Sequence, residues 1–172
     1  GPKLSPVELA QRYAHVLDTA VRITRQMPDS ELARELPNRP RSWRVLMHHV
    51  FQIPAAFMDS EQQGIVLTRE ELVAAPPEDM VTTAQIVAFG EAVTERFSTW
   101  WDGANGEEFG GSVEAYFGHT SRHDLFERTV WHSTQHVRQV SSLLEQAGVV
   151  PDNPLTLADI EGLPLTERIW DD

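Results

Sequence analysis

Two histidines four residues apart, His132 and His136, form the pattern in this sequence that most directly suggests chemistry. On a helix, residues at that spacing lie on one face with Cβ atoms about 5–6 Å apart, so both imidazoles can bind one metal ion. The apolar residues Leu125, Leu143 and Leu144 continue the same stripe and should face the interior. A buried neutral imidazole needs a polar partner, which a metal would supply. The stripe is also compatible with two hydrogen-bonded histidines in a core.

A third ligand could come from the adjacent pair His48 and His49. Neighbouring residues on a helix point about 100° apart, so only one of the two can face the core. His49 shares its face with Leu46 and Ile53, which favours it, although His48 leaves the register open. If the two helices run parallel, as up-and-down alternation would make them, His49 and His132 differ in depth by about 6 Å. A three-histidine site is therefore feasible, and it would keep the open position of a catalytic metal centre.

A second histidine pair at the same spacing, His119 and His123, straddles a predicted helix start and is the weaker metal site. His119 and Tyr116 lie in a glycine-rich loop. They could line the mouth of a site or supply a proton, or simply form loop surface.

Two polar residues flank the histidine pair on the same helix. Gln139 follows His136 by three residues and could orient that ligand, or close the end of the bundle. Arg128 lies one turn before His132 and could meet an anionic substrate. A surface ion pair between Arg128 and Asp124 or Glu127 is the simpler interpretation. Another ion pair is expected for Arg138.

The elements that must position these residues are helices. Ser5, Pro6 and Glu8 form a helix start with a capping box. Apolar residues then recur at helical spacing in four segments. The predicted helices run from 5 to 27, 42 to 63, 82 to 101 and 121 to 147.

The connections are long. Residues 28–41 should contain one helical turn, Thr68 should cap a short helix, and residues 64–81 are long enough to cross over along a bundle. A glycine-rich loop precedes the fourth helix, and the apolar residues of the tail 149–172 should hold it against the helices. We expect an all-α fold, a four-helix bundle in one domain over 5–172, with residues 1–2 as a tag remnant. Trp100, Trp101 and Trp131 are expected in the core or at a dimer seam.

Composition excludes several classes of function. The formal charge is 14 − 26 = −12, which argues against nucleic acid and anionic membranes as partners. The absence of cysteine excludes thiolate ligands and nucleophiles and fits a cytoplasmic protein. No apolar run approaches the 18–20 residues or so of a membrane span.

Three blocks of the sequence together resemble the DinB/YfiT-like family. They are Arg41-Ser42 with His49-Val50-Phe51, the segment Glu127–Gln139 around Trp131-His132 and His136, and Gly162-Leu163-Pro164-Leu165 with Trp170. The resemblance covers residues 5–172. It implies a four-helix bundle in which His49, His132 and His136 hold a divalent metal, zinc first, with nickel or iron as alternatives.

Family members of this kind include transferases and isomerases in which the metal activates a low-molecular-weight thiol. We therefore expect a metal-dependent enzyme that directs a thiol or water at a small electrophilic substrate, with a homodimer plausible. The alternatives are a non-catalytic protein that binds a small molecule or metal, and a purely structural bundle with core histidines.

Overall fold

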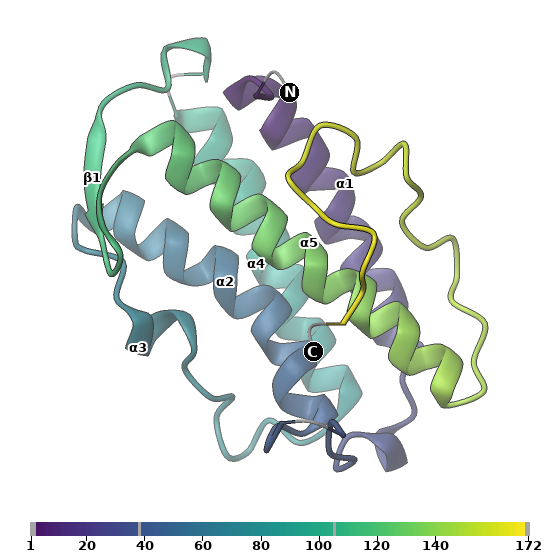
Figure 1. Cartoon of the computed structure of the whole chain (residues 1–172). Coiled ribbons are helices and arrows are strands. Elements are labelled where there is room, and N and C mark those ends of the chain that lie inside the picture. The colour runs from purple at the N-terminus through teal and green to yellow at the C-terminus, as the bar shows by residue number, and fades with distance from the viewer. Residues whose placement is uncertain (1–2, 38, 105, 171–172) are drawn as a thin grey trace.

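The computed structural model describes residues 3–37, 39–104 and 106–170 and is mostly helical. Four long helices lie side by side (Figure 1). They are α1 (Pro6–Arg25), α2 (Trp43–Gln63), α4 (Thr83–Gly103) and α5 (Arg122–Gln146). The short helices are η1 (Asp29–Glu31), α3 (Arg69–Leu72) and η2 (Gly106–Glu108). Residues 1–2, the predicted tag remnant, and the last two residues of the predicted domain lie outside the described residues.

The ends of the long helices follow from local sequence. Each begins after a residue whose side-chain oxygen accepts a hydrogen bond from the backbone N–H three positions on. These caps are Ser5, Ser42, Thr82 and Ser121. Gly64 ends α2 in the left-handed region, with φ of 66°. The four predicted helices are therefore confirmed, as are the short helix capped by Thr68 and the turn near residue 30.

The direction of the helices corrects one prediction. At one end of the pair, Arg122 Nη2 lies 2.7 Å from Glu61 Oε1. Eleven residues further along α5, Ser133 Oγ donates to the carbonyl of Val50 at 3.0 Å. Residue numbers rise along α5 as they fall along α2, so the two helices are antiparallel rather than parallel. The connector over residues 64–82 crosses back along the molecule before α4 begins, which removes the expected alternation (Figure 1).

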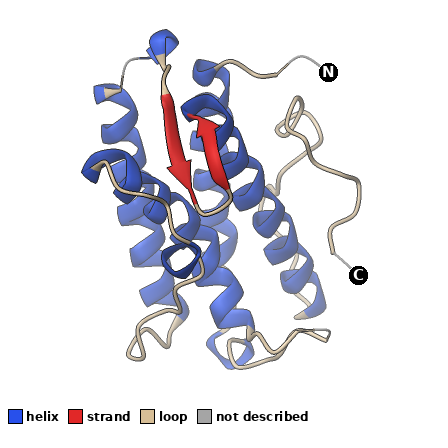
Figure 2. Cartoon of the chain, turned by 60° about the vertical axis from the view of Figure 1, so that its left-hand side comes forward, coloured by secondary structure: helices blue, strands red, loops and turns tan. Residues whose placement is uncertain are grey.

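A small antiparallel hairpin corrects the all-α prediction (Figure 2). Strands β1 (Ser112–Ala115) and β2 (Gly118–Ser121) occupy the region expected to be loop. Their two-residue connection is Tyr116-Phe117, which lacks the asparagine and glycine typical of such turns, so the sequence carried no hairpin signal. The N–H of Tyr116 donates to the carbonyl of Leu67 at 2.9 Å, which ties the hairpin to the segment between α2 and α3.

The C-terminal tail runs back along α1 and α5, as its apolar residues predicted (Figure 1). Leu163 is buried, and Arg22 donates to the carbonyls of Asp152 and Asn153. Arg138 was expected in an ion pair, but it donates to the tail carbonyls of Thr166 and Glu167 instead. The tail is thus part of the folded unit.

The core contains a dense aromatic cluster between α2, α4 and α5. Its members are Phe57, Phe97, Trp100, Phe109 and Phe126. Phe126 is fully buried, 5.5 Å from the ring of Phe57 and 5.6 Å from that of Trp100. Trp100 is therefore a core residue, as predicted. No helix in the described part of the chain is long and apolar enough to cross a membrane.

Candidate metal centre

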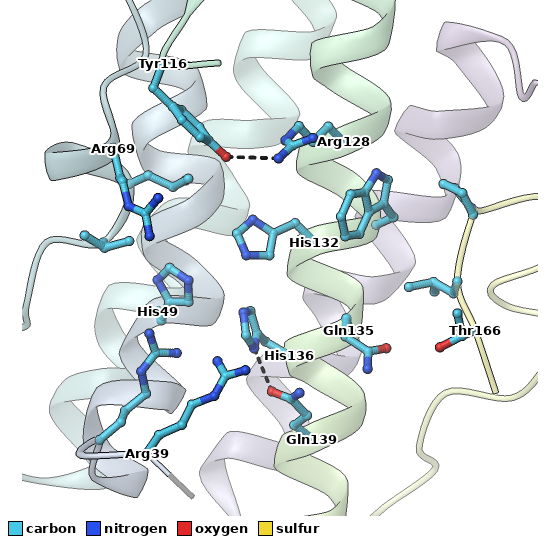
Figure 3. A pocket seen from close by; sticks show the side chains of 16 residues that line it. Arg39, His49, Arg69, Tyr116, Arg128, His132, Gln135, His136, Gln139 and Thr166 are labelled. Atoms are coloured by element: carbon cyan, nitrogen blue, oxygen red, sulfur yellow. Dashed lines mark hydrogen bonds between the residues drawn. The ribbon is translucent and has the colours of Figure 1, made fainter. Parts of the chain in front are cut away.

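Three histidines converge between α2 and α5. His49 comes from α2, and His132 and His136 come from successive turns of α5 (Figure 3). Each offers a ring nitrogen, and these three nitrogens lie within 4.8 Å of one another. The ring centroids are 5.5 Å apart for His49 and His132, 4.9 Å for His49 and His136, and 5.1 Å for the pair on α5. Small side-chain rotations would bring all three nitrogens to one ion.

Local packing explains this convergence. The four-residue spacing places His132 and His136 on one face of α5, as the sequence predicted. The buried hydrogen bond from Ser133 to the carbonyl of Val50 fixes the register between the helices. Because Ser133 follows His132 and Val50 follows His49, this contact sets the three rings opposite one another. Antiparallel packing therefore builds the site that the sequence analysis had argued from parallel helices.

Electrostatics keep all three rings neutral at pH 7. Burial, together with the nearby rings of His136 and His132, lowers the pKa of His49 to about 2. Burial also lowers the pKa of His132 to about 3 and that of His136 to about 4. Neutral imidazole has the free lone pair that a metal needs. The surroundings thus disfavour a proton at the positions that would ligate a cation.

Gln139 orients one of these rings, as predicted. Its Oε1 lies 2.7 Å from Nδ1 of His136. Its Nε2 donates to the backbone carbonyl of Ile169 at 3.0 Å, which directs the amide oxygen toward the histidine. His136 Nδ1 must then carry the hydrogen, and its Nε2 keeps the lone pair. Partners of this kind fix the tautomer of metal-binding histidines.

His48 belongs to the core, which settles the choice between the two neighbours on α2. Its ring stacks on Phe89 with centroids 5.0 Å apart, and it is 3% exposed. Its Nδ1 makes no hydrogen bond with any residue that the structure describes. Burial lowers the pKa of His48 to about 4.

A cavity of about 560 Å³ lies against the three histidines. Exposed side chains, including Arg69 and Tyr116, line its mouth, so solvent reaches it (Figure 3). Arg128 was expected either to meet an anionic substrate or, more simply, to pair with acidic neighbours on the surface. It lines this cavity and donates to Tyr116 Oη at 3.2 Å. It also lies 4.5 Å from the centre of the Phe117 ring. Trp131, expected in the core or at a dimer seam, is half-buried against the core and also lines the cavity.

The second histidine pair does not form a site. His119 lies on β2 outside the cavity lining, with Nδ1 2.7 Å from a carboxylate oxygen of Glu114. His123 lies in the first turn of α5, and its Nε2 is 2.8 Å from the carbonyl of Leu4. Because His119 lies on a strand and His123 on the helix that follows it, the four-residue spacing does not place the two rings on one helix face. Of the four candidates for a catalytic role, Tyr116, Arg128 and Gln139 reach the cavity and His119 does not.

The sequence analysis assigned no role to three arginines that line the cavity. Arg39 and Arg41 precede α2, and Arg69 begins α3. A compositional signal existed: lysine occurs once, so 13 of the 14 cationic side chains are arginine. Arginine is favoured over lysine where anions are bound in a fixed geometry.

Comparison of the chain with protein-family models and with curated proteins finds no match. The DinB/YfiT-like assignment therefore stays a prediction, and the geometry of the site carries the functional argument.

Proposed function

We propose that this protein is a divalent-metal-dependent enzyme whose metal is held by His49, His132 and His136. The observation that carries the proposal is the convergence of three neutral imidazoles on the wall of a solvent-accessible cavity. Three-histidine ligation suits zinc first, with nickel and iron as alternatives. We further propose that the four long helices form a four-helix bundle of the DinB type.

The reaction we propose is attack of a low-molecular-weight thiol, or of water, on a small electrophilic substrate. A bound divalent metal lowers the pKa of a coordinated thiol or water, which makes it nucleophilic near neutral pH. The chain contains no cysteine, so a thiol nucleophile must come from a bound small molecule.

The remaining side chains have defined tasks in this proposal. Gln139 holds the tautomer of His136 through the 2.7 Å contact at Nδ1. Arg128, held by Tyr116, presents positive charge at the cavity and so favours a negatively charged substrate. The Tyr116 hydroxyl can donate a hydrogen bond to a substrate at the cavity mouth. These polar groups support catalysis over simple storage, since a storage cavity needs no proton donor or anion clamp.

The test combines metal analysis with a conjugation assay. The parent should hold about one equivalent of a divalent metal after reconstitution, and the variant H132A should not. H119A is the matched control, because His119 lies outside the cavity. The metal-loaded parent should then accelerate conjugation of at least one of several low-molecular-weight thiols to an aryl halide. A parent that binds metal yet accelerates neither conjugation nor hydrolysis would instead support the non-catalytic binding protein. A parent that binds none would support the structural bundle.

A further inference from the structure

The cavity concentrates positive charge in a strongly acidic protein. Four of its 14 cationic side chains line this one space, although the net charge of the chain is −12. They are Arg39, Arg41, Arg69 and Arg128. Among the described residues that line it, none is aspartate or glutamate. A divalent cation on the histidines would add further positive charge. Such a space favours an anionic occupant.

The arginines lie on two sides of the histidines. Figure 3 shows Arg69 and Arg128 on one side of the three rings and Arg39 on the other. Arg41 belongs with Arg39, because it lies two residues further along the same segment before α2 and lines the same cavity. The two groups come from different parts of the chain, the loop before α2 on one side and α3 with α5 on the other. An occupant that pairs with both groups therefore needs two negative groups, one on each side of the histidines.

Two of these guanidinium groups have no structural task. The side chains of Arg41 and Arg69 make no hydrogen bond or ion pair with any residue that the structure describes. Arginines elsewhere are bonded: Arg44 donates to the carbonyls of Met80 and Pro77, Arg96 pairs with Asp59 and Arg122 pairs with Glu61. Arg41 is half-buried, where an unpaired charge costs stability. Its place in the cavity is explained by a ligand that completes the pairing.

We propose that the cavity takes a small organic dianion with two separated carboxylates, one paired with Arg41 and the other with Arg69, so that the ligand spans the three histidines. This inference names the substrate class of the proposed enzyme and rests on that function. A guanidinium pairs with a carboxylate through two parallel hydrogen bonds. A cavity of about 560 Å³ lies within the usual range for small-molecule sites.

The arrangement also couples the anion to the metal. With arginines and a dication in one cavity and no acidic lining side chain among the described residues, each positive group raises the free energy of the others. A bound dianion relieves this repulsion. Metal and dianion should therefore each strengthen the binding of the other, by the same factor in both directions.

Calorimetry with succinate tests the proposal, using metal-free and zinc-loaded protein. Succinate should bind saturably and more tightly to the zinc-loaded form, with an affinity that falls as salt rises. Propionate, with one carboxylate, and succinamide, which is neutral, should each bind at least roughly tenfold more weakly. The variants R41Q and R69Q should each lose about 10- to 100-fold in succinate affinity. R25Q, whose parent residue pairs with Glu91 on the exposed surface, should match the parent.

Equal binding of succinate and propionate, or unchanged binding by R41Q and R69Q, would overturn the two-carboxylate proposal. The metal-free arm keeps it separate from the proposed function. Succinate binding without any metal binding would leave the anion site standing and remove the metal enzyme. Metal binding with no succinate binding would remove the anion site and leave the metal enzyme standing. Circular dichroism spectra that match the parent exclude misfolding of the variants.

Discussion

The two ends of the α2–α5 helix pair both place aromatic rings between the helices, but the rings differ in chemistry. Toward the end of α2 and the start of α5, the space between them holds aromatic rings, with Phe57 stacked on Phe126 at 5.5 Å. Eight residues earlier on α2 and six to ten later on α5, imidazoles take the place of the phenyl rings. Ring centroids there are as close, 4.9 to 5.5 Å. The backbone register is shared, so side-chain chemistry alone distinguishes a dry core from a site.

The difference shows what each end contributes. Burial of apolar rings stabilises the fold, and no polar atom of a phenyl ring needs a partner. Burial of imidazoles instead lowers their pKa and leaves ring nitrogens to be satisfied. Gln139 satisfies one nitrogen of His136. The remaining lone pairs face one another around a point that a cation can occupy. One end of the pair therefore supports the fold, and the other holds potential ligands.

The largest effect is expected from the aromatic end. The variant F126A should lower the free energy of unfolding by about 3–5 kcal/mol, because it opens a cavity among fully buried rings. Urea denaturation measures this loss, and metal stoichiometry should be unchanged. A loss of metal binding in folded F126A would show that the two ends are not independent.

Adjacent residues on α2 sharpen the same contrast. H49A should weaken metal affinity by more than about 100-fold, since removing an outer partner of a ligand already costs 10- to 100-fold or so. H48A should leave the affinity unchanged and lower only stability, because His48 stacks on Phe89 in the core. Competition with a chromophoric chelator measures both. Comparable metal loss in the two variants would contradict the assignment of His49 as the ligand.

Variants of Gln139 test how far metal affinity depends on the hydrogen bond to His136 Nδ1. Q139L should weaken metal affinity by about 10- to 100-fold, because His136 loses the acceptor that fixes its tautomer. Q139E keeps an acceptor oxygen at that place and should retain most of the affinity. If Q139E were as weak as Q139L, the hydrogen bond to Nδ1 would not be the reason for the loss.

The pH dependence of stability should differ between the ends as well. An unfolded histidine binds a proton near pH 6.5, whereas folded His132 and His136 do so only at about pH 3 and 4. Between about pH 4 and 6.5 the unfolded chain therefore binds more protons, and the stability of the metal-free protein rises with pH until about 6.5. Urea denaturation of metal-free parent and H132A across this range should give a shallower rise for the variant. Identical slopes would mean that His132 is not buried in its neutral form.

The sequence predicted what depends on local chemistry and missed what depends on the chain path. The capping residues Ser5 and Thr68 located two helix starts, and the spacing of His132 and His136 located two of the three histidines of the site. The Tyr116-Phe117 turn carries no local signal, so the hairpin was read as loop. Arg69 reaches the cavity only because the connector after α2 folds back beside it. Nothing near Arg69 in the sequence indicates that path.

X-ray absorption spectroscopy of the zinc-loaded protein tests the central claim most directly. The account predicts one zinc per chain with three imidazole nitrogens at about 2.0–2.1 Å and a fourth donor, such as water oxygen, that does not come from the protein. H132A and H136A, if loaded at all, should each lose one imidazole from the spectrum. A zinc with one imidazole or none, or a spectrum that neither variant changes, would contradict the convergence of His49, His132 and His136 on a single ion.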